Sequence, residues 1–284
     1  MKAHTVAALK AEYPLPLLLE VAGLARSTFF YHQARFERPD PQAELKAVIG
    51  EVFHAAHGRY GHRRVHAKLR ARGWQVAKKT VLALMRELGL FCRVRRRRRY
   101  NSYTGEVGQI AANVLDRDFT AAAPNQKWVT DVTEFRVAGA KVYLPPILDL
   151  FDHSVVAHSW SLSPNLELTN SALRAAIATL EPGQHPLVHS DQGFQYRHRS
   201  WRVLLADADA RQSMSRKGNC YDNAVMENFF GHLKSELFYC NRFDTIEDFT
   251  TALETYIHWY NNERISTKLK SLSPVQYRAQ TLAA

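Results

Sequence analysis

The sequence contains few cysteines and no long apolar run, and both absences narrow the class of protein. The three cysteines lie far apart and form no CxxC pair, which argues against a disulfide framework and indicates a reducing compartment. A membrane-spanning helix needs about 20 consecutive apolar residues, and no such run occurs. The N-terminus also lacks the apolar core of a signal peptide. We therefore expect a cytoplasmic protein with no membrane partner.

Two further absences concern chemistry. The phosphate-binding motif GxxxxGK[ST] does not occur, so ATP-driven chemistry is not indicated. Four histidines lie close together but are accompanied by no suitably spaced cysteine pair: His54, His57, His62 and His66. We favour packing and phosphate contact for these histidines over a structural zinc site.

The charge is unevenly distributed along the chain. The net charge is +11; residues 1–120 contain 22 Lys and Arg against 10 Asp and Glu, and residues 121–284 contain 16 against 17. The basic excess therefore lies in the N-terminal part, which is typical of a protein that binds a polyanion there. A merely solubilising surface would not explain this segregation. We expect a nucleic acid as the partner.

The N-terminal part divides into two helical segments. Residues 1–36 predict two short helices joined at Gly23, which is the outline of a helix-turn-helix. Residues 42–99 predict a basic helical DNA-binding domain, in which Val65 and Leu69 mark the apolar side of a cationic helix. This domain ends in an arginine-rich run whose charges DNA phosphates would neutralise.

The cations that we expect to contact DNA lie on that helix and in that run. They are Arg63, Arg64, Lys68, Arg95, Arg96, Arg97, Arg98 and Arg99. Phosphate contacts of this kind give affinity and salt dependence rather than readout of the base sequence. Residues 100–122 have little periodicity and predict a linker.

The pattern changes at Gln126, where strand-like runs begin. The predicted elements are strands at 127–137, 141–149, 154–162, 187–190 and 210–214 and helices at 165–180, 199–206 and 222–238. This order predicts an α/β fold: an RNase H-like core with a mixed five-stranded sheet flanked by helices, preceded by the N-terminal all-α helix-turn-helix-like segments. We place the catalytic core at 123–240 and a C-terminal helical extension at 241–284.

Three acids lie at positions in this core that suit a metal-dependent reaction. Asp131 lies in the first predicted strand, Asp191 ends the fourth, and Glu227 lies on the last helix, with 35 residues between the second and third acids. Such carboxylates can hold two divalent cations, which activate an attacking oxygen and stabilise a leaving oxygen at a phosphodiester. We therefore predict that these residues are metal ligands and catalytic residues.

Neighbouring residues either support this site or compete with it. Asn223 and Lys234 fall near the face of Glu227 at about 100° per residue, so that face would carry a carboxylate, an amide and a cation able to hold a phosphate. Asp149 is either a structural hydrogen-bonding acid or an auxiliary site residue. For His189 we favour a structural role over a catalytic one. Further competing acids are Glu134, Asp152, Asp222 and Glu236.

Five stretches form an ordered set of motifs that covers nearly the whole chain. They are GHRRVH at 61–66, WVTDVT at 128–133, HSDQGFQY at 189–196, SRKGNCYDNAVMENFF at 215–230 with LKSE at 233–236, and YIHWYNNER at 256–264 with LSPVQY at 272–277. In this order they resemble the orfB-type transposases of the IS-three insertion-sequence family. These are bacterial DDE transposases with a catalytic core like that of retroviral integrases.

The resemblance implies a mechanism and partners. Asp131, Asp191 and Glu227 would be the acidic triad, and Lys234 the family's basic residue, in contact with DNA. Two Mg²⁺ ions, with Mn²⁺ tolerated, would serve cleavage at the element ends and strand transfer by the exposed 3′-hydroxyl. The implied partners are terminal inverted repeats, target DNA and further copies of the chain on DNA. No covalent protein–DNA intermediate is required, so Tyr196 is interpreted as a packing or DNA-contacting residue.

The resemblance also implies an upstream partner. In this family an orfA product with a helix-turn-helix and a leucine zipper is commonly fused to orfB by frameshifting. This chain begins at its own Met1 and has no sustained leucine heptads, so we expect an orfA-type partner or fusion. The alternative function is a DNA-binding accessory or regulatory protein, inactive without orfA. A non-transposing RNase H-like nuclease is disfavoured by the spacing of the acids and by the basic helical part.

Overall fold

The computed structural model describes residues 2–34, 40–93, 111–216 and 220–283. The predicted DNA contacts Arg95, Arg96, Arg97, Arg98 and Arg99, and the predicted linker up to residue 110, lie outside these ranges. The chain divides into two units, residues 1–51 and 52–284, which are described separately. Within the described ranges, no helix combines the length and apolar character needed to cross a membrane.

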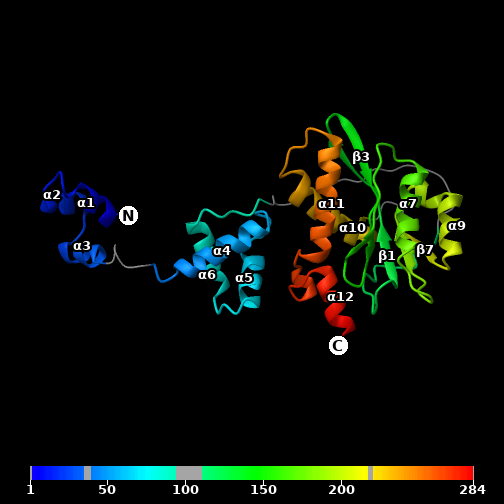
Figure 1. Ribbon diagram of the computed structural model, residues 1–284, viewed down its shortest axis with the longest axis horizontal. Helices are drawn as coiled ribbons and strands as arrows, with labels where there is room; N and C mark the ends of the chain where they lie inside the picture. The colour runs from blue at the N-terminus through cyan, green and yellow to red at the C-terminus, as the bar shows by residue number, and fades with distance from the viewer. Residues whose placement is uncertain (1, 35–39, 94–110, 217–219, 284) are drawn as a thin grey trace. The chain divides into compact units, whose positions relative to one another are not determined.

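The first unit contains three short helices around a small core (Figure 1). They are α1 (Lys2–Leu9), α2 (Leu15–Ala22) and α3 (Arg26–Gln33). Gly23 ends α2 with a φ of 55°, a left-handed conformation that glycine adopts freely. The sequence predicts only two helices here. The pattern does not indicate α1 because Ala3 and Val6 are its only residues buried in the core.

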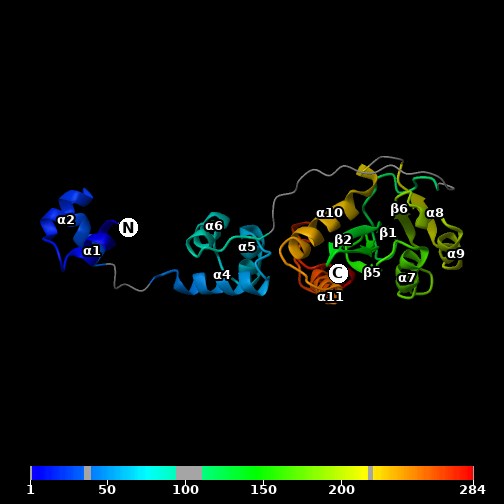
Figure 2. The same cartoon turned by 90° about the horizontal axis from the view of Figure 1, so that it is seen from above.

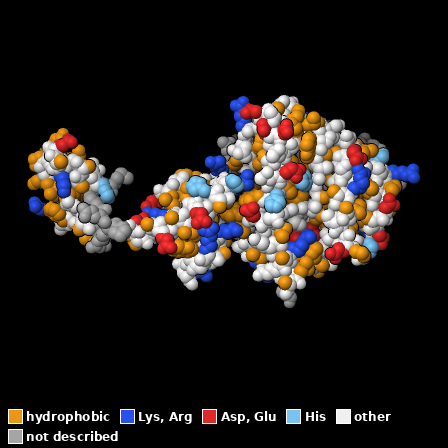
Figure 3. All heavy atoms as spheres, in the orientation of Figure 1, with side chains coloured by type: hydrophobic (Ala, Val, Ile, Leu, Met, Phe, Trp, Pro, Cys, Tyr) orange, Lys and Arg blue, Asp and Glu red, His pale blue; other side chains and the backbone are white. Residues whose placement is uncertain are grey.

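Three further helices follow. They are α4 (Ala43–Ala55), which spans the division between the units, α5 (His62–Ala71) and α6 (Lys78–Glu87). On α5, Val65 and Leu69 are buried, as the amphipathic pattern predicts, whereas Arg63 and Arg70 are exposed. Figure 3 shows Lys and Arg side chains, in blue, gathered over this part of the surface. Arg63 and Arg70 of α5 therefore lie where a polyanion can reach them.

The core is a mixed five-stranded sheet in the order β5–β4–β1–β6–β7. Its strands are β1 (Lys127–Thr130), β4 (Ile147–Asp149), β5 (Val155–Ala157), β6 (Leu187–Ser190) and β7 (Arg211–Met214). β1 pairs antiparallel with β4 and parallel with β6, β4 pairs antiparallel with β5, and β6 pairs parallel with β7. The predicted number of strands and the mixed sheet are therefore present.

The first two predicted strands, 127–137 and 141–149, are each interrupted and form β1 to β4 instead. β2 (Thr133–Val137) and β3 (Ala140–Leu144) form a separate antiparallel pair. The backbone N–H of Val132 donates to the carboxylate of Asp131 at 2.7 Å instead of joining a ladder. Pro145 and Pro146 lack the N–H that a strand needs, so the chain also breaks between β3 and β4. The third predicted strand shortens to β5.

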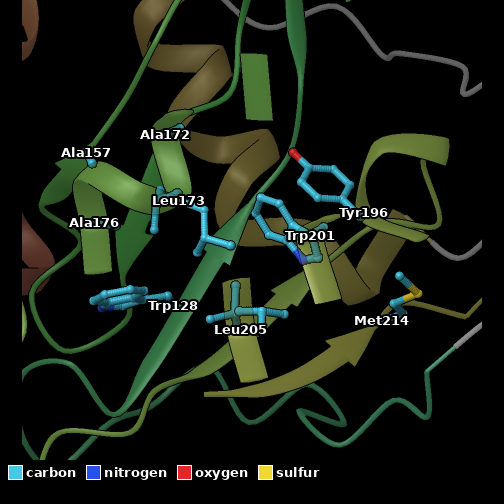
Figure 4. Close-up of a cluster of buried hydrophobic side chains, with 11 residues drawn as sticks. Trp128, Ala157, Ala172, Leu173, Ala176, Tyr196, Trp201, Leu205 and Met214 are labelled. Carbon is cyan, nitrogen blue, oxygen red and sulfur yellow. The ribbon is translucent and has the colours of Figure 1, made fainter. Parts of the chain in front are cut away.

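Helices cover the sheet on both sides (Figures 1 and 2). On one side lie α7 (Leu166–Ile177) and α9 (Arg199–Asp207), and on the other α10 (Ala224–Leu233) and α11 (Ile246–Asn262). Figure 4 shows the core beneath α7 and α9, where Leu173, Trp201 and Leu205 gather around the sheet. Burial of these large side chains supplies much of the driving force for folding.

The last predicted helix, 222–238, is not uniform. It begins as a 3₁₀ turn at Cys220–Asn223, continues as α10, and widens into the π-helical segment η2 (Lys234–Phe238). π-helical turns inside α-helices occur frequently at functional sites. The chain ends in α11, the short turn Thr267–Leu269 and α12 (Pro274–Leu282), which Ser273 and Gln276 begin with a capping box.

Replacement of Leu173 by alanine should lower the free energy of unfolding by about 2–5 kcal/mol, because it leaves a cavity in the core. Denaturant unfolding followed by circular dichroism measures this loss. Leu282 is 63% exposed, so the control Leu282→Ala should change stability by less than about 0.5 kcal/mol. Equal losses in the two variants would contradict the packing of α7 on the sheet.

Candidate active site

Two of the predicted acids meet at one edge of the sheet. Asp131 directly follows β1, and Asp191 directly follows β6. The two strands are parallel, and their register pairs Val129 with His189, so the same offset brings Asp131 beside Asp191. Both acids thus lie just beyond strand ends, not within a strand as predicted for Asp131. The carboxyl ends of parallel strands are where open α/β sheets commonly bind ligands.

The third acid comes from the helix that packs against β1. Glu227 lies in the first turn of α10, and Asn223 lies immediately before that helix. The side-chain amide of Asn223 donates to Asp131 Oδ2 at 3.0 Å, while Val132 N–H donates to Oδ1 at 2.7 Å. Asn223 therefore ties the start of the Glu227 helix to Asp131.

The charges of Asp191 and Glu227 act on Asp131. Burial raises the pKa of Asp131 well above its ordinary value, and the charges of Asp191 and Glu227 raise it further. Burial also raises the pKa of Asp191, while the Gly193 N–H and the charge of Arg197 oppose the rise. A bound cation would relieve the repulsion that raises the pKa of Asp131.

The carboxylates provide the oxygen donors that divalent cations prefer, but they do not form a closed cage in the described part of the chain. Among the described residues, no three His, Cys, Asp or Glu side chains are grouped tightly enough to enclose a metal ion. Mg²⁺ commonly binds through one or two carboxylates, with water and substrate phosphates completing its coordination. Asp131, Asp191 and Glu227 fit that open type of site, because they provide hard oxygen donors whose repulsion a cation removes.

Lys234 lies where its charge acts on Asp131. It is the first residue of the π-helical segment, and its Nζ lies 5.6 Å from the centre of the Phe135 ring. Burial lowers the pKa of Lys234, whereas the charges of Glu134 and Asp131 raise it. Its charge in turn lowers the pKa of Asp131. The structure thus brings Lys234 into the electrostatic environment of the acids.

Two residues beside the acids, Gly193 and Arg197, were not singled out from the sequence. Gly193 is needed because a Cβ there would lie 2.9 Å from Asp191 Oδ1. Arg197 is 9% exposed, and its positive charge lowers the pKa of Asp191. Tyr196 is buried against Trp201, and its hydroxyl lies 3.3 Å from Thr130 Oγ1, so it packs beneath the site. Arg197 lies six residues after Asp191, and no single strand or helix contains both residues. The sequence pattern therefore did not indicate that this cation acts on Asp191.

Four of the competing acids are held by arginines, whereas Glu134 is exposed and pairs with Lys141 at 3.0 Å. Asp222 is buried and accepts hydrogen bonds from Arg216 and Arg117, and the Arg216 bonds lead in holding its pKa well below the ordinary value. Arg278 bonds both Asp149 and Asp152. Arg264 binds Glu236. These arginine-bound acids stabilise the fold. Of the two roles considered for Asp149, its contacts match the structural hydrogen-bonding acid.

His189 also has a structural environment. It is fully buried, and its Nδ1 lies 2.8 Å from Ser213 Oγ on the neighbouring strand β7. Burial lowers its pKa to about 4, so the imidazole is neutral at pH 7.

The predicted DNA contacts on α5 differ in their exposure to solvent and in their contacts within the protein. Arg63 is exposed and Lys68 is half-buried, whereas Arg64 lies 3.3 Å from a carboxylate oxygen of Glu236. Arg64 is therefore engaged within the protein.

Three family models match this chain. The HTH-like domain family matches residues 40–98, and two integrase core domain families match residues 121–220 and 227–282. The fold and the matched families define an integrase-type core of the RNase H-like class that is preceded by an HTH-like domain.

Three relatives among the curated proteins are transposases. The transposase InsK of IS150 from Escherichia coli K12 is 50% identical over 96% of both chains. The transposase InsF of IS3A from the same strain is 32% identical over 96% of this chain and 97% of its own length. A transposase of IS1353 from Shigella flexneri is 43% identical over 98% of this chain, which spans 54% of that relative. The chain belongs to the insertion-sequence transposases of the IS150 and IS3 type.

Two solved structures show a weaker likeness. A simian T-cell lymphotropic virus intasome, in complex with the PP2A regulatory subunit B56 gamma, has a TM-score of 0.48 and 18% identity, covering 81% of this chain and 74% of that one. The HTLV-2 integrase catalytic core in complex with magnesium has a TM-score of 0.45 and 18% identity, covering 55% of this chain and 98% of that one.

Stability should fall as the pH drops below the ordinary pKa of histidine, because the folded state keeps His189 neutral. The lowered folded pKa, about 4 against 6.5, means that only the unfolded chain gains this proton between those pH values. From pH 7.5 to pH 5 this effect should cost about 2 kcal/mol of unfolding free energy. Denaturant unfolding at both pH values, compared with His189→Asn, isolates the effect, because the variant lacks this titration. An identical pH dependence in both proteins would refute it.

Proposed function

We propose that the chain cleaves DNA at the ends of its insertion sequence in a divalent-metal-dependent reaction and joins the exposed 3′-hydroxyl to target DNA. The observation that carries the proposal is the meeting of Asp131 and Asp191 at one sheet edge, within electrostatic reach of Glu227. Membership of the insertion-sequence transposases supports it.

In this proposal Asp131, Asp191 and Glu227 hold two Mg²⁺ ions, for which Mn²⁺ would substitute. The bound cations supply activation of the attacking oxygen and stabilisation of the leaving oxygen. Asn223 keeps the Asp131 carboxylate oriented through its 3.0 Å hydrogen bond. Lys234, whose charge acts on Asp131, holds a phosphate oxygen beside the acids.

The proposed reaction has two steps, cleavage and joining, and neither requires a covalent bond between protein and DNA. In the first, water attacks the phosphorus, the bond between phosphorus and the 3′-oxygen breaks, and that oxygen takes up a proton to become the 3′-hydroxyl. In the second, this hydroxyl attacks a target phosphodiester, loses its proton to solvent, and displaces another 3′-oxygen. Both steps are in-line displacements that the same acids serve.

DNA is held, in this proposal, by the basic part of the chain. Arg63 and Lys68 on α5 would contact phosphates of the terminal inverted repeats, together with the arginine-rich run. Because two ends must be joined to one target, the chain would act as a homo-oligomer on DNA. An orfA-type polypeptide would complete end recognition.

Replacement of Glu227 by glutamine should reduce cleavage and joining by roughly a thousandfold or more, because the lost ligand removes several kcal/mol of transition-state stabilisation. DNA binding and the melting temperature should remain close to those of the wild-type protein. The assay follows terminal-repeat DNA with Mg²⁺, with and without an upstream polypeptide, and Glu181→Gln in an exposed turn is the control.

A Glu227→Gln protein that still joined ends would refute the triad. Wild-type protein that bound DNA but never cut it, with the upstream polypeptide present, would instead establish an accessory or regulatory role.

Replacement of Asp131 by asparagine should abolish stabilisation by metal while leaving the fold intact. Wild-type protein should gain about 2 to 3 kcal/mol of stability at a Mg²⁺ concentration one hundred times its dissociation constant. The Asp131→Asn variant should gain no stability from Mg²⁺. Without metal it should be as stable as the wild-type protein, because the substitution removes a carboxylate charge that the folded state disfavours, as the raised pKa of Asp131 indicates. Calorimetric melting with and without Mg²⁺ measures both effects. A metal shift retained in Asp131→Asn would place the cation elsewhere.

A further inference from the structure

The carboxylate of Glu236 lies at the centre of a buried cluster outside the acidic triad. Its side chain is 1% exposed, and Arg264 binds it in a bidentate manner at 2.7 and 2.8 Å. The hydroxyl of Tyr256 donates to the same carboxylate at 2.9 Å. Burial alone would raise the pKa of Glu236, but the charge and hydrogen bonds of Arg264 prevail and lower it to about 2. This half of the cluster belongs to the core and its C-terminal helices.

The other half of the cluster comes from the HTH-like domain. Arg64 Nη1 lies 3.3 Å from Glu236 Oε1, and Arg59 Nε donates to the backbone oxygen of Glu236 at 3.1 Å. The Arg59 guanidinium also lies over the rings of Trp259 and Tyr256, at 4.7 and 5.4 Å from their centres. Two arginines from one domain thus converge on a single residue of the other.

Tyr60 adds an uncharged anchor between the same parts of the chain. It is 2% exposed, and its hydroxyl donates to the backbone oxygen of Glu263 at 3.2 Å and accepts from the N–H of Ile265 at 3.1 Å. Its ring centre lies 6.1 Å from that of Trp259. Residues 59 to 64 therefore contact both the Glu236 segment and the turn after α11.

The position of Glu236 gives these contacts a consequence for the site. Glu236 follows Lys234 by two residues in the π-helical segment, which continues directly from the helix of Glu227. On the opposite side of the contact, Arg64 lies in the first turn of α5, whose exposed cations include Arg63 and Arg70. These contacts therefore connect the cationic helix to the segment that continues from the helix of Glu227.

We propose that the Glu236 cluster fixes α5 relative to the acidic triad and so determines which phosphodiester of the bound DNA is cut. Arg59, Arg64 and Glu236 are then positioning residues, and Arg64 is not a phosphate contact. The inference rests on the proposed DNA cleavage, because a cut position exists only if the chain cuts. Misplacement of a substrate by about 1 Å can reduce a rate a hundredfold, so a loosened connection should redistribute cuts.

The test removes the HTH-like side of the cluster and leaves the core side intact. In Arg59→Met/Arg64→Met, Arg264 and Tyr256 still satisfy the Glu236 carboxylate, so the core should fold. The matched control is Arg63→Met/Arg70→Met, which removes the same charge from exposed positions of the same domain. Glu236→Gln is less suitable, because it leaves the buried Arg264 unpaired.

Cut positions in terminal-repeat DNA are mapped at nucleotide resolution. In Arg59→Met/Arg64→Met, the ratio of the main cut to cuts at neighbouring phosphodiesters should fall roughly 10- to 100-fold. The control Arg63→Met/Arg70→Met should bind DNA more weakly and cut it more slowly, but the ratio of the main cut to neighbouring cuts should equal that of the wild-type protein. An unchanged ratio in both variants, with equal losses of affinity, would overturn the proposal and make Arg64 a phosphate contact.

A second measurement requires no cutting. Amide hydrogen exchange at residues 59–65 and 259–266, measured without DNA, should rise about tenfold in Arg59→Met/Arg64→Met and stay unchanged in the control, with β1 and β6 unaffected in both. Unchanged exchange at these segments in Arg59→Met/Arg64→Met would show that the Glu236 cluster does not connect the two domains, and would overturn the proposal. Wild-type protein that shows this protection but cuts no DNA would instead refute the proposed function.

Discussion

The parallel pairing of β1 with β6 is the constraint on which the rest of the site depends. Because side chains that follow parallel strands leave the sheet at the same edge, the pairing of Val129 with His189 brings Asp131 and Asp191 to that edge together. α10, which packs on β1, then needs to supply only one more carboxylate. The buried cluster of Trp128, Leu173 and Trp201 holds the strands and α7 in this register.

Gathering these carboxylates costs free energy, and the surrounding groups offset only part of that cost. Asn223 and the Val132 N–H bind the Asp131 carboxylate without adding charge. Lys234 acts on Asp131 and Arg197 on Asp191, yet burial still raises the pKa of both acids. The remaining repulsion is the electrostatic condition that would favour binding of a divalent cation, as the proposed function requires.

Sequence patterns predicted the features that depend on short spacings. The amphipathic α5 and the five strands of the sheet follow from helical period, alternation and turn residues, and the family matches confirm the core. The interruption at Asp131 was missed because a run of strand-forming residues does not show that a side chain captures the next N–H. The contact between Arg64 and Glu236 was also missed, since a cation on an amphipathic helix looks the same whether a phosphate or a distant carboxylate neutralises it.

The groups that bind each acid separate the carboxylates held by arginines from those that we propose as metal ligands. Asp222 and Glu236 are each bound by arginines, and the pKa of each falls although burial opposes the fall. Asp131 and Asp191 are bound instead by an amide and by backbone N–H groups, and the pKa of each rises. A guanidinium on either acid would occupy the oxygens that a metal ion needs and would lower its affinity for the cation. The cations nearest the site, Lys234 and Arg197, reduce the repulsion through charge, while the described hydrogen bonds to both carboxylates come from neutral donors.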